Sequence, residues 1–227
     1  MVRLRQSLLT GLALLPLVAF TSTPSALDGQ AAEGIPRLDL TPKRPKAITI
    51  YPAEDGQPLS GSSLSRGRLY WYLVYTLENK SEHAGDFFVT LRATSDKGRR
   101  YSDLALPSVE ERIEKVEKRR FHSKSDLLDN DAEGGFGTAR RFAPGDKLEC
   151  VAIFNPIDPE ADKITIRVHG LVDDIQIEEL PGGGYKVTER VFVLNYERPG
   201  DEFYTALDGF EFKGSEWTKR VTETPAE

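Results

Sequence analysis

The chain has few side chains with the chemistry that catalysis or metal binding requires, namely three histidines and one cysteine. These are His83, His122, His169 and Cys150. A catalytic or metal-binding histidine needs a partner at a defined spacing, but the sequence has no G-x-S-x-G, H-E-x-x-H or phosphate-binding glycine motif. We therefore expect three surface histidines, no catalytic, cofactor-binding or metal-binding residue, and a protein that is not an enzyme.

Carboxylates are abundant, but their spacing does not bring them together. Asp173 and Asp174 are adjacent, as are Glu178 and Glu179, and adjacent residues of a strand point to opposite faces. One acidic run matches the first, third, fifth and sixth positions of a calcium loop with Asp129, Asp131, Glu133 and Gly134. The twelfth position is Arg140 instead of a bidentate glutamate, so we interpret residues 126–133 as a flexible acidic loop. Whether this loop holds an ion stays open.

Two further groups of side chains suggest binding chemistry. The basic run at residues 118–120 would suit an anion or a lipid surface, but four glutamates between residues 110 and 117 offset its charge. Tyr70, Tyr72 and Trp217 are the aromatics that could form a platform for a sugar ring. Whether these rings are exposed or buried decides between a carbohydrate-binding module and a scaffold.

Charge and cysteine content exclude some classes of protein. The 227 residues hold 30 basic and 36 acidic side chains, a net charge of −6, so nucleic acid is not an expected partner. A single cysteine allows no internal disulfide, and the fold must rely on its hydrophobic core. Cys150 alternates with Leu148, Ala152 and Phe154 along one face of a predicted strand, which favours a buried, inert thiol.

The amino-terminal residues resemble an export signal. Arg3 and Arg5 precede an apolar run at residues 8–20, which is shorter than the roughly 20 residues of a membrane-spanning helix. We predict a signal peptide over residues 1–26, cleaved between 22 and 32, and then a linker rich in proline over residues 27–45. The mature chain should have no transmembrane segment and should lie in the periplasm, in the cell envelope or outside the cell.

We predict that the remaining chain forms one domain over residues 46–217, followed by a polar tail at residues 218–227. Alternating apolar side chains predict short strands, among them a pair within residues 142–171 joined by a polar connection. The strongest strand carries large apolar groups on both faces, so it should be central and covered on both sides. Its two faces are Leu69, Trp71, Leu73, Tyr75 and Leu77 on one side and Tyr70, Tyr72 and Val74 on the other.

One segment has a helical period. Ser108 and Glu111 have the spacing of a capping box, and the apolar stripe Val109, Ile113 and Val116 predicts a helix over about residues 109–121. Neither this stripe nor the second apolar face of the central strand can remain in water without cause. We therefore expect the helix to lie across that face, leaving its charged side and the acidic loop as a contact surface.

These elements predict a mainly β protein: an immunoglobulin-like antiparallel β-sandwich with one inserted α-helix. The segments LYWYLVYTLENKS, VTLRATSDKG, FAPGDKLECVAIF, DPEADKITIRVHGL and VFVLNYERPGDEF, with Trp217 near the end, resemble exported single-domain β-sandwich proteins of planctomycete type. More loosely, residues 70–79 and 144–168 are similar to immunoglobulin-like accessory domains of bacterial surface proteins. The resemblance implies export and a sandwich, and it implies no activity.

The sequence therefore predicts an exported, non-enzymatic cell-envelope protein that binds another protein or has a structural role. A carbohydrate-binding module and a hydrolase of unrecognised type are the alternatives. An envelope protein or a polysaccharide would be the partner, and no partner-binding residue or oligomeric state follows from the sequence.

Overall fold

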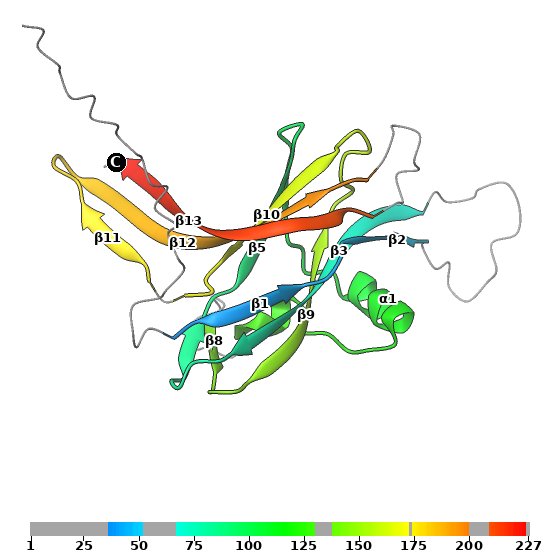
Figure 1. Ribbon diagram of the computed structural model, residues 1–227, viewed down its shortest axis with the longest axis horizontal. Coiled ribbons are helices and arrows are strands. Elements are labelled where there is room, and N and C mark those ends of the chain that lie inside the picture. Colours follow the sequence, from blue (N-terminus) through cyan, green and yellow to red (C-terminus); the bar gives the residue numbers. More distant parts are fainter. Residues whose placement is uncertain (1–35, 52–66, 130–137, 173, 200–208, 226–227) are drawn as a thin grey trace, which may run out of the picture.

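The computed structural model describes residues 36–51, 67–129, 138–172, 174–199 and 209–225 (Figure 1). The predicted signal peptide at 1–26 and its cleavage site lie outside the described residues. No helix among the described residues is long and apolar enough to cross a membrane.

Within the described residues, the strands form three antiparallel sheets. The first sheet consists of β1 (Leu38–Pro42), β2 (Lys46–Ile50), β3 (Arg68–Asn79) and β9 (Lys147–Phe154). The second sheet consists of β5 (Thr90–Ser95), β6 (Arg100–Ser102), β10 (Lys163–His169), β11 (Gln176–Glu179), β12 (Gly184–Glu197) and β13 (Glu211–Pro225). A small sheet consists of β4 (Gly85–Phe87), β7 (Leu128–Asp129) and β8 (Thr138–Phe142). The helices are α1 (Pro107–Glu117) and α2 (Lys124–Leu127).

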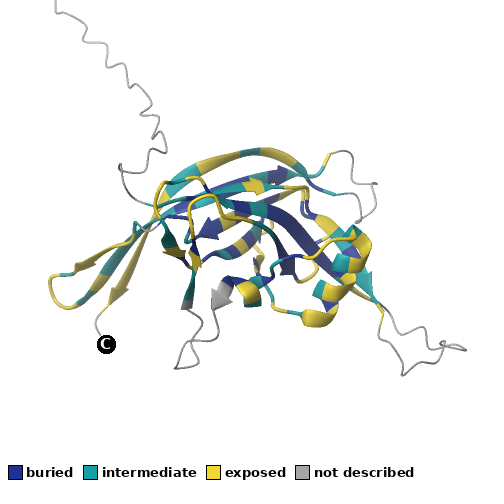
Figure 2. Cartoon of the chain, turned by 90° about the horizontal axis from the view of Figure 1, so that it is seen from below, coloured by how far each residue is buried: buried dark blue, intermediate teal, exposed yellow. Residues whose placement is uncertain are grey.

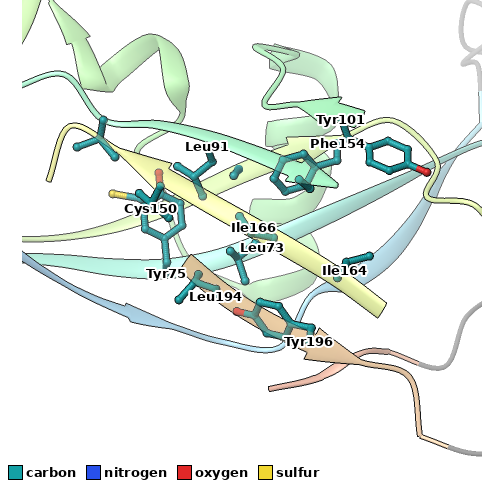
Figure 3. Close-up of a cluster of buried hydrophobic side chains, with 14 of the residues drawn as sticks. Leu73, Tyr75, Leu91, Tyr101, Cys150, Phe154, Ile164, Ile166, Leu194 and Tyr196 are labelled. Carbon is teal, nitrogen blue, oxygen red and sulfur yellow. The ribbon is translucent and has the colours of Figure 1, made fainter. Parts of the chain in front are cut away.

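The first and second sheets face each other across the main hydrophobic core. Figure 3 shows Leu73, Tyr75 and Cys150 of the first sheet packed against Ile166 and Leu194 of the second. The predicted mainly β antiparallel sandwich with one inserted helix is confirmed. The two predicted strands of residues 142–171 are also present as β9 and β10, but they belong to different sheets, so the polar connection between them crosses the sandwich.

Strand β3 is central because it is apolar on both faces. It pairs with β9 along one edge and with β1 and β2 along the other. Its second face forms an outer cluster beneath α1, as predicted from the sequence. The buried members of this outer cluster are Ile48, Tyr70, Tyr72, Val74, Val109, Ile113, Phe121, Val151 and Ile153.

The details of α1 differ from the sequence prediction. The helix spans Pro107–Glu117 instead of about 109–121, because Pro107 starts it and Lys118 adopts the left-handed conformation that ends it. The predicted capping box is wrong: Leu106 is the N-cap, and its N–H donates to Glu110 Oε1 at 3.0 Å. Val116 was expected to be buried but is 52% exposed, so the apolar stripe ends at Ile113.

A polar contact fastens the last turn of α1 to the first sheet. Glu117 Oε1 accepts hydrogen bonds from Tyr72 Oη at 2.7 Å and from Lys46 Nζ at 2.6 Å. Burial opposes ionisation of Glu117, but these two hydrogen bonds outweigh it and lower the pKa of its carboxyl. The hydroxyl of Tyr72 therefore helps to position the helix, and its ring lies in the outer cluster.

Both predicted chain-end segments are wrong within the described residues. Residues 38–42, assigned to the linker, form β1, and Leu38 is fully buried. Prolines do not prevent this because β1 is an edge strand. Residues 218–225, expected to be a frayed polar tail, continue β13 and pair with β12 over their whole length. The backbone pairing with β12 therefore holds residues 218–225 in a strand, although their polar composition did not indicate one.

Asp103 links the two sheets at the end of β6. Its N–H donates to the carbonyl of Leu91 at 3.3 Å, and its Oδ1 accepts from the N–H of Ile153 at 2.9 Å. The side chain is buried. Burial raises the pKa of Asp103 to about 7, although the hydrogen bond from Ile153 favours the ionised form.

This carboxyl should make the stability of the fold depend on pH. Between pH 3.8 and about 7, the folded protein keeps a proton that the unfolded chain has lost, so stability decreases as pH rises through this window. The decrease should be roughly 4 kcal/mol at most, at about 1.4 kcal/mol for each pKa unit. Asp103→Asn keeps the acceptor for Ile153 and should lose this dependence. Urea unfolding of both proteins at pH 5 and pH 8 measures it, and an equal change in both would contradict the assignment.

Three strand segments extend beyond the sandwich as an arm. The arm consists of residues 176–179 of β11, 185–188 of β12 and 221–224 of β13, which pair side by side. In Figure 1 it extends to the left of the main body, and Figure 2 shows that its residues are mostly exposed or half-buried. The arm therefore presents two sheet faces outside the core.

Candidate functional site

A cleft of about 430 Å³ opens on the outer face of the second sheet, where this sheet meets the small sheet and the base of the arm. Its lining combines charged, polar and apolar side chains from β4, β5, β8, β10, β12 and β13. The lining residues are Asp86, Phe87, Phe88, Thr90, Arg92, Ala139, His169, Gly170, Val172, Ile175, Glu189 and Arg220.

Gly170 sets the shape of the cleft floor. It follows β10 with a φ of +75°, and a Cβ at this position would overlap the carbonyl oxygen of Phe88. Phe88 lies between β4 and β5. Its side chain is exposed, while Phe87 and Val89 on either side are buried. The close approach of these two backbones therefore requires glycine.

His169 was predicted to be a surface histidine, and this is wrong. It lies on the outer face of β10 as expected but is only 8% exposed. In the tautomer that donates from Nδ1, its N–H bonds to Glu189 Oε2 at 3.1 Å, and Glu189 Oε1 pairs with Arg220 Nη1 at 3.1 Å. The three side chains link β10, β12 and β13 across the cleft wall. Glu189 lies 20 residues along the chain from His169, so local spacing gave no indication of the pair.

This arrangement holds a histidine but no aligned nucleophile. The hydroxyl of Thr90 is the only one among the described lining residues, and Thr90 is the cross-strand neighbour of His169. No hydrogen bond joins the two side chains within the described part of the chain. The pair of His169 and Glu189 therefore orients the imidazole without activating a neighbouring hydroxyl in this structure.

Two arginines face each other on the same outer surface. Arg92 of β5 and Arg167 of β10 are directly opposite in the sheet register, and both are exposed. Like charges in this position repel each other. Arg92 lines the cleft, and its guanidinium has no hydrogen bond or ion pair with any described residue. This guanidinium is therefore available to a carboxylate or another anion.

An apolar surface continues from the cleft onto the arm. Ile175 lines the cleft and is exposed, and Ile177 and Tyr185 beyond it are 65% and 51% exposed. Ile177 pairs with Val187, which lies two residues from Tyr185 on the same strand face, and Glu189 follows on that face. Val221 pairs with Thr188 and therefore projects from the opposite face. We call Ile175, Ile177 and Tyr185 the arm patch.

The aromatics proposed as a sugar platform do not come together. Tyr70 and Tyr72 are buried in the outer cluster beneath α1. Trp217 is half-buried in the second sheet, where its ring lies 4.9 Å from that of Phe192. These rings serve in packing, so the platform formed by Tyr70, Tyr72 and Trp217 is excluded.

The thiol of Cys150 and the side-chain amide of Asn79 are buried inside the fold. Cys150 is fully buried as predicted, and burial raises the pKa of its thiol to about 12. Asn79 begins the sequence Asn-Lys-Ser of a glycosylation sequon, but its amide is buried and donates to the carbonyls of His83 and Phe142. Both groups are therefore held inside the fold.

The other predicted charged groups do not form a site in the described residues. His122 is half-buried, and burial and the charge of Arg140 lower its pKa. Lys118 ends α1, and Arg119 pairs with Glu149 at 2.9 Å. Residues 130–133 of the acidic loop lie outside the described residues. Within the rest, no three His, Cys, Asp or Glu side chains gather as a metal site would require.

The arm patch was not identified from the sequence, although a signal was present. In the run DDIQIEEL, two isoleucines alternate with polar residues, which predicts a strand with one apolar face. Such a pattern normally indicates a face turned toward the core. The structure shows that here it faces solvent, because the arm lies outside the sandwich.

Comparisons with family models, curated proteins and solved structures find no match for this chain. The resemblance to exported planctomycete proteins and to immunoglobulin-like accessory domains is therefore still only a prediction.

Proposed function

We propose that this protein is an exported, non-enzymatic module of the cell envelope that binds another protein through the cleft and the arm patch. The observation that carries the proposal is the continuous surface from the cleft to Ile175, Ile177 and Tyr185. Exposed apolar side chains that cluster beside a polar cleft are typical of protein interaction surfaces. This surface replaces the charged side of α1 as the favoured contact region.

The two parts of the surface define the chemistry of the partner. The arm patch suits an apolar segment, since contact would remove Ile177 and Tyr185 from water. The cleft contributes Arg92, whose guanidinium has no partner among the described residues. A guanidinium can bind a carboxylate through two parallel hydrogen bonds. The fitting partner is a protein segment with apolar side chains and a nearby acidic group.

The character of the cleft supports binding more than catalysis. Its histidine is hydrogen-bonded to Glu189, and its one described hydroxyl, on Thr90, is not aligned with that histidine. A hydrolase that works through a side-chain nucleophile would require this nucleophile and its base in contact. Export rests on the basic and apolar leader read from the sequence, and a fold that needs no disulfide is compatible with that location.

Opposite faces of the arm provide a matched test. Ile177→Asp places a carboxylate in the arm patch, while Val221→Asp makes the same kind of change on the opposite face at similar exposure. We expect Ile177→Asp to reduce capture of the partner at least about tenfold, because it removes an apolar contact and places an acid beside an acidic partner. Val221→Asp should retain capture. Quantitative affinity purification of the tagged full chain from its own envelope measures both.

The same experiment distinguishes the alternatives. Equal capture by the two variants would contradict the arm patch as the binding surface. A different result would instead support a carbohydrate-binding module: the protein binds an acidic envelope polysaccharide, Ile177→Asp leaves this binding intact, and Arg92→Ala weakens it. Melting curves of the variants provide the control, since both substitutions lie on exposed side chains and should leave the fold intact.

A further inference from the structure

Three exposed arginines lie together on the outer face of the second sheet. Arg92 of β5 is directly opposite Arg167 of β10, and Arg100 of β6 is opposite Thr94, two residues along β5 from Arg92. These pairings contain no register shift, so the paired residues project from the same face. Leu91 beside Arg92 is buried in the main core, so that face points away from the core. We call Arg92, Arg100 and Arg167 the arginine track.

The three guanidinium groups are close enough to act on one ligand. Residues directly opposite in an antiparallel pair have Cα atoms about 5 Å apart, and diagonal neighbours are roughly 7–8 Å apart. Arg167 is opposite Arg92, and Arg100 is the diagonal neighbour of Arg92. Nη1 of Arg167 also lies 3.5 Å from Oγ1 of Thr94, the residue directly opposite Arg100. The side chain of Arg167 therefore extends diagonally toward the Arg100 end of the track.

No acidic side chain among the described residues neutralises the track. Arg92 and Arg100 have no hydrogen bond or ion pair with any described residue, and Arg167 bonds only to the hydroxyl of Thr94. The cause is not a shortage of acids, because the chain has 36 acidic and 30 basic side chains. The track is therefore a local positive surface on a chain of negative net charge.

Two acidic side chains of neighbouring positions are engaged elsewhere. Asp96 follows Thr94 by two residues, and its Oδ2 accepts the N–H of Asp162 at 3.4 Å. Glu189 on the far side of the cleft pairs with His169 and Arg220. The repulsion between Arg92 and Arg167 thus has no described counter-charge, and an anionic ligand would offset it.

The spacing of the track fits carboxylates on an extended peptide. Every second side chain of an extended segment projects from the same face, at a separation of about 7 Å. This separation is close to the diagonal spacing expected between Arg92 and Arg100. Each guanidinium can hold one carboxylate through two parallel hydrogen bonds. Acidic residues at alternate positions of one segment can therefore contact successive arginines.

We propose that the arginine track binds an acidic segment of the protein partner, with aspartate or glutamate at alternate positions. The inference rests on the proposed function, since it places this segment next to the one that contacts the arm patch. Arg92 lines the cleft that Ile175 of the arm patch also lines, so the two surfaces are continuous. The partner chain then contacts the arm patch with apolar side chains and the track with carboxylates.

A synthetic peptide of alternating glutamate and serine tests the track without the arm patch, because it has no apolar side chain. Isothermal titration calorimetry of the full chain, expressed with its own leader, measures its affinity at low salt. We expect a dissociation constant below about 1 mM. A peptide of alternating lysine and serine should not bind, since it carries the same sign of charge as the track.

Paired arginine variants provide the matched comparison. Arg100→Gln/Arg167→Gln removes two charges from the track and leaves the cleft residue Arg92 in place. Arg112→Gln/Arg120→Gln removes the same charge from exposed arginines of α1 and the residues after it, on the opposite side of the sandwich. We expect the first variant to weaken peptide binding about tenfold or more and the second to change it by less than about twofold. Melting curves should show that both variants remain folded, because all four side chains are exposed.

The outcomes separate this inference from the proposed function. Ile177→Asp should leave binding of the acidic peptide nearly unchanged, although the proposed function predicts that it loses the partner. Absence of peptide binding, or equal weakening by the two double variants, would overturn the arginine track even if Ile177→Asp still loses the partner. Binding of polygalacturonate at least as tight as that of the peptide, at equal carboxylate concentration, would also overturn it and indicate an acidic polysaccharide as the ligand.

Discussion

Ile113→Asp should destabilise the whole domain by at least about 4 kcal/mol. Ile113 is fully buried between α1 and the outer face of β3, in the cluster that contains Tyr70, Tyr72 and Val74. The substitution removes the apolar contacts and places an unpaired carboxylate at the packed interface. Since a domain has only about 5–15 kcal/mol of stability, this is a large fraction of the total.

Val116→Asp on the same helix is the matched control. Val116 is 52% exposed, so its replacement should change the free energy of unfolding by no more than about 0.5 kcal/mol. Urea unfolding monitored by tryptophan fluorescence measures both variants. Equal stability of Ile113→Asp and the unmodified protein would show that α1 does not cover β3, and it would return Tyr70 and Tyr72 to the possible binding residues.

Gly170→Ala should lower the free energy of unfolding by about 3 kcal/mol or more, because two effects add at this position. A side chain is strained at a φ of +75°, and its Cβ would also overlap the carbonyl of Phe88. Gly98 has nearly the same φ of +77° but nothing within 4 Å of an added Cβ. Gly98→Ala should therefore cost only the backbone strain, about 1–2 kcal/mol.

The difference in the free energy of unfolding between Gly170→Ala and Gly98→Ala measures the energetic effect of the close approach of Gly170 to Phe88. Unfolding curves of both variants under the same conditions give this difference. The cleft should also change shape in any Gly170→Ala protein that folds, because Gly170 directly follows His169 and lies against Phe88. Equal destabilisation by the two substitutions would contradict the tight contact and the role of Gly170 in shaping the cleft.

Several features followed from residue order alone because they depend on local repetition. Alternating apolar residues identified β3 as a strand buried on both faces, and a helical stripe identified α1. Two apolar surfaces that could not remain in water predicted that α1 covers β3. Such inferences succeed because side-chain direction repeats every two residues in a strand and about every 3.6 in a helix.

The proposed binding site was not predictable in this way. The same alternation that placed Ile166 in the core placed Ile177 on the exposed arm, because a pattern shows that a face is apolar but not what covers it. His169 was taken for a surface residue because its partner Glu189 belongs to a strand brought beside it only by folding.

The sequence by itself determined the strands, the helix, the antiparallel sandwich and a buried Cys150, since each depends on a local pattern and the need to bury apolar area. Only the tertiary structure decided that residues 38–42 and 218–225 join sheets, that Gly170 meets Phe88, and that the cleft continues onto the arm. These features depend on contacts between segments distant along the chain. Their energies come from pairing and packing partners that no local pattern specifies.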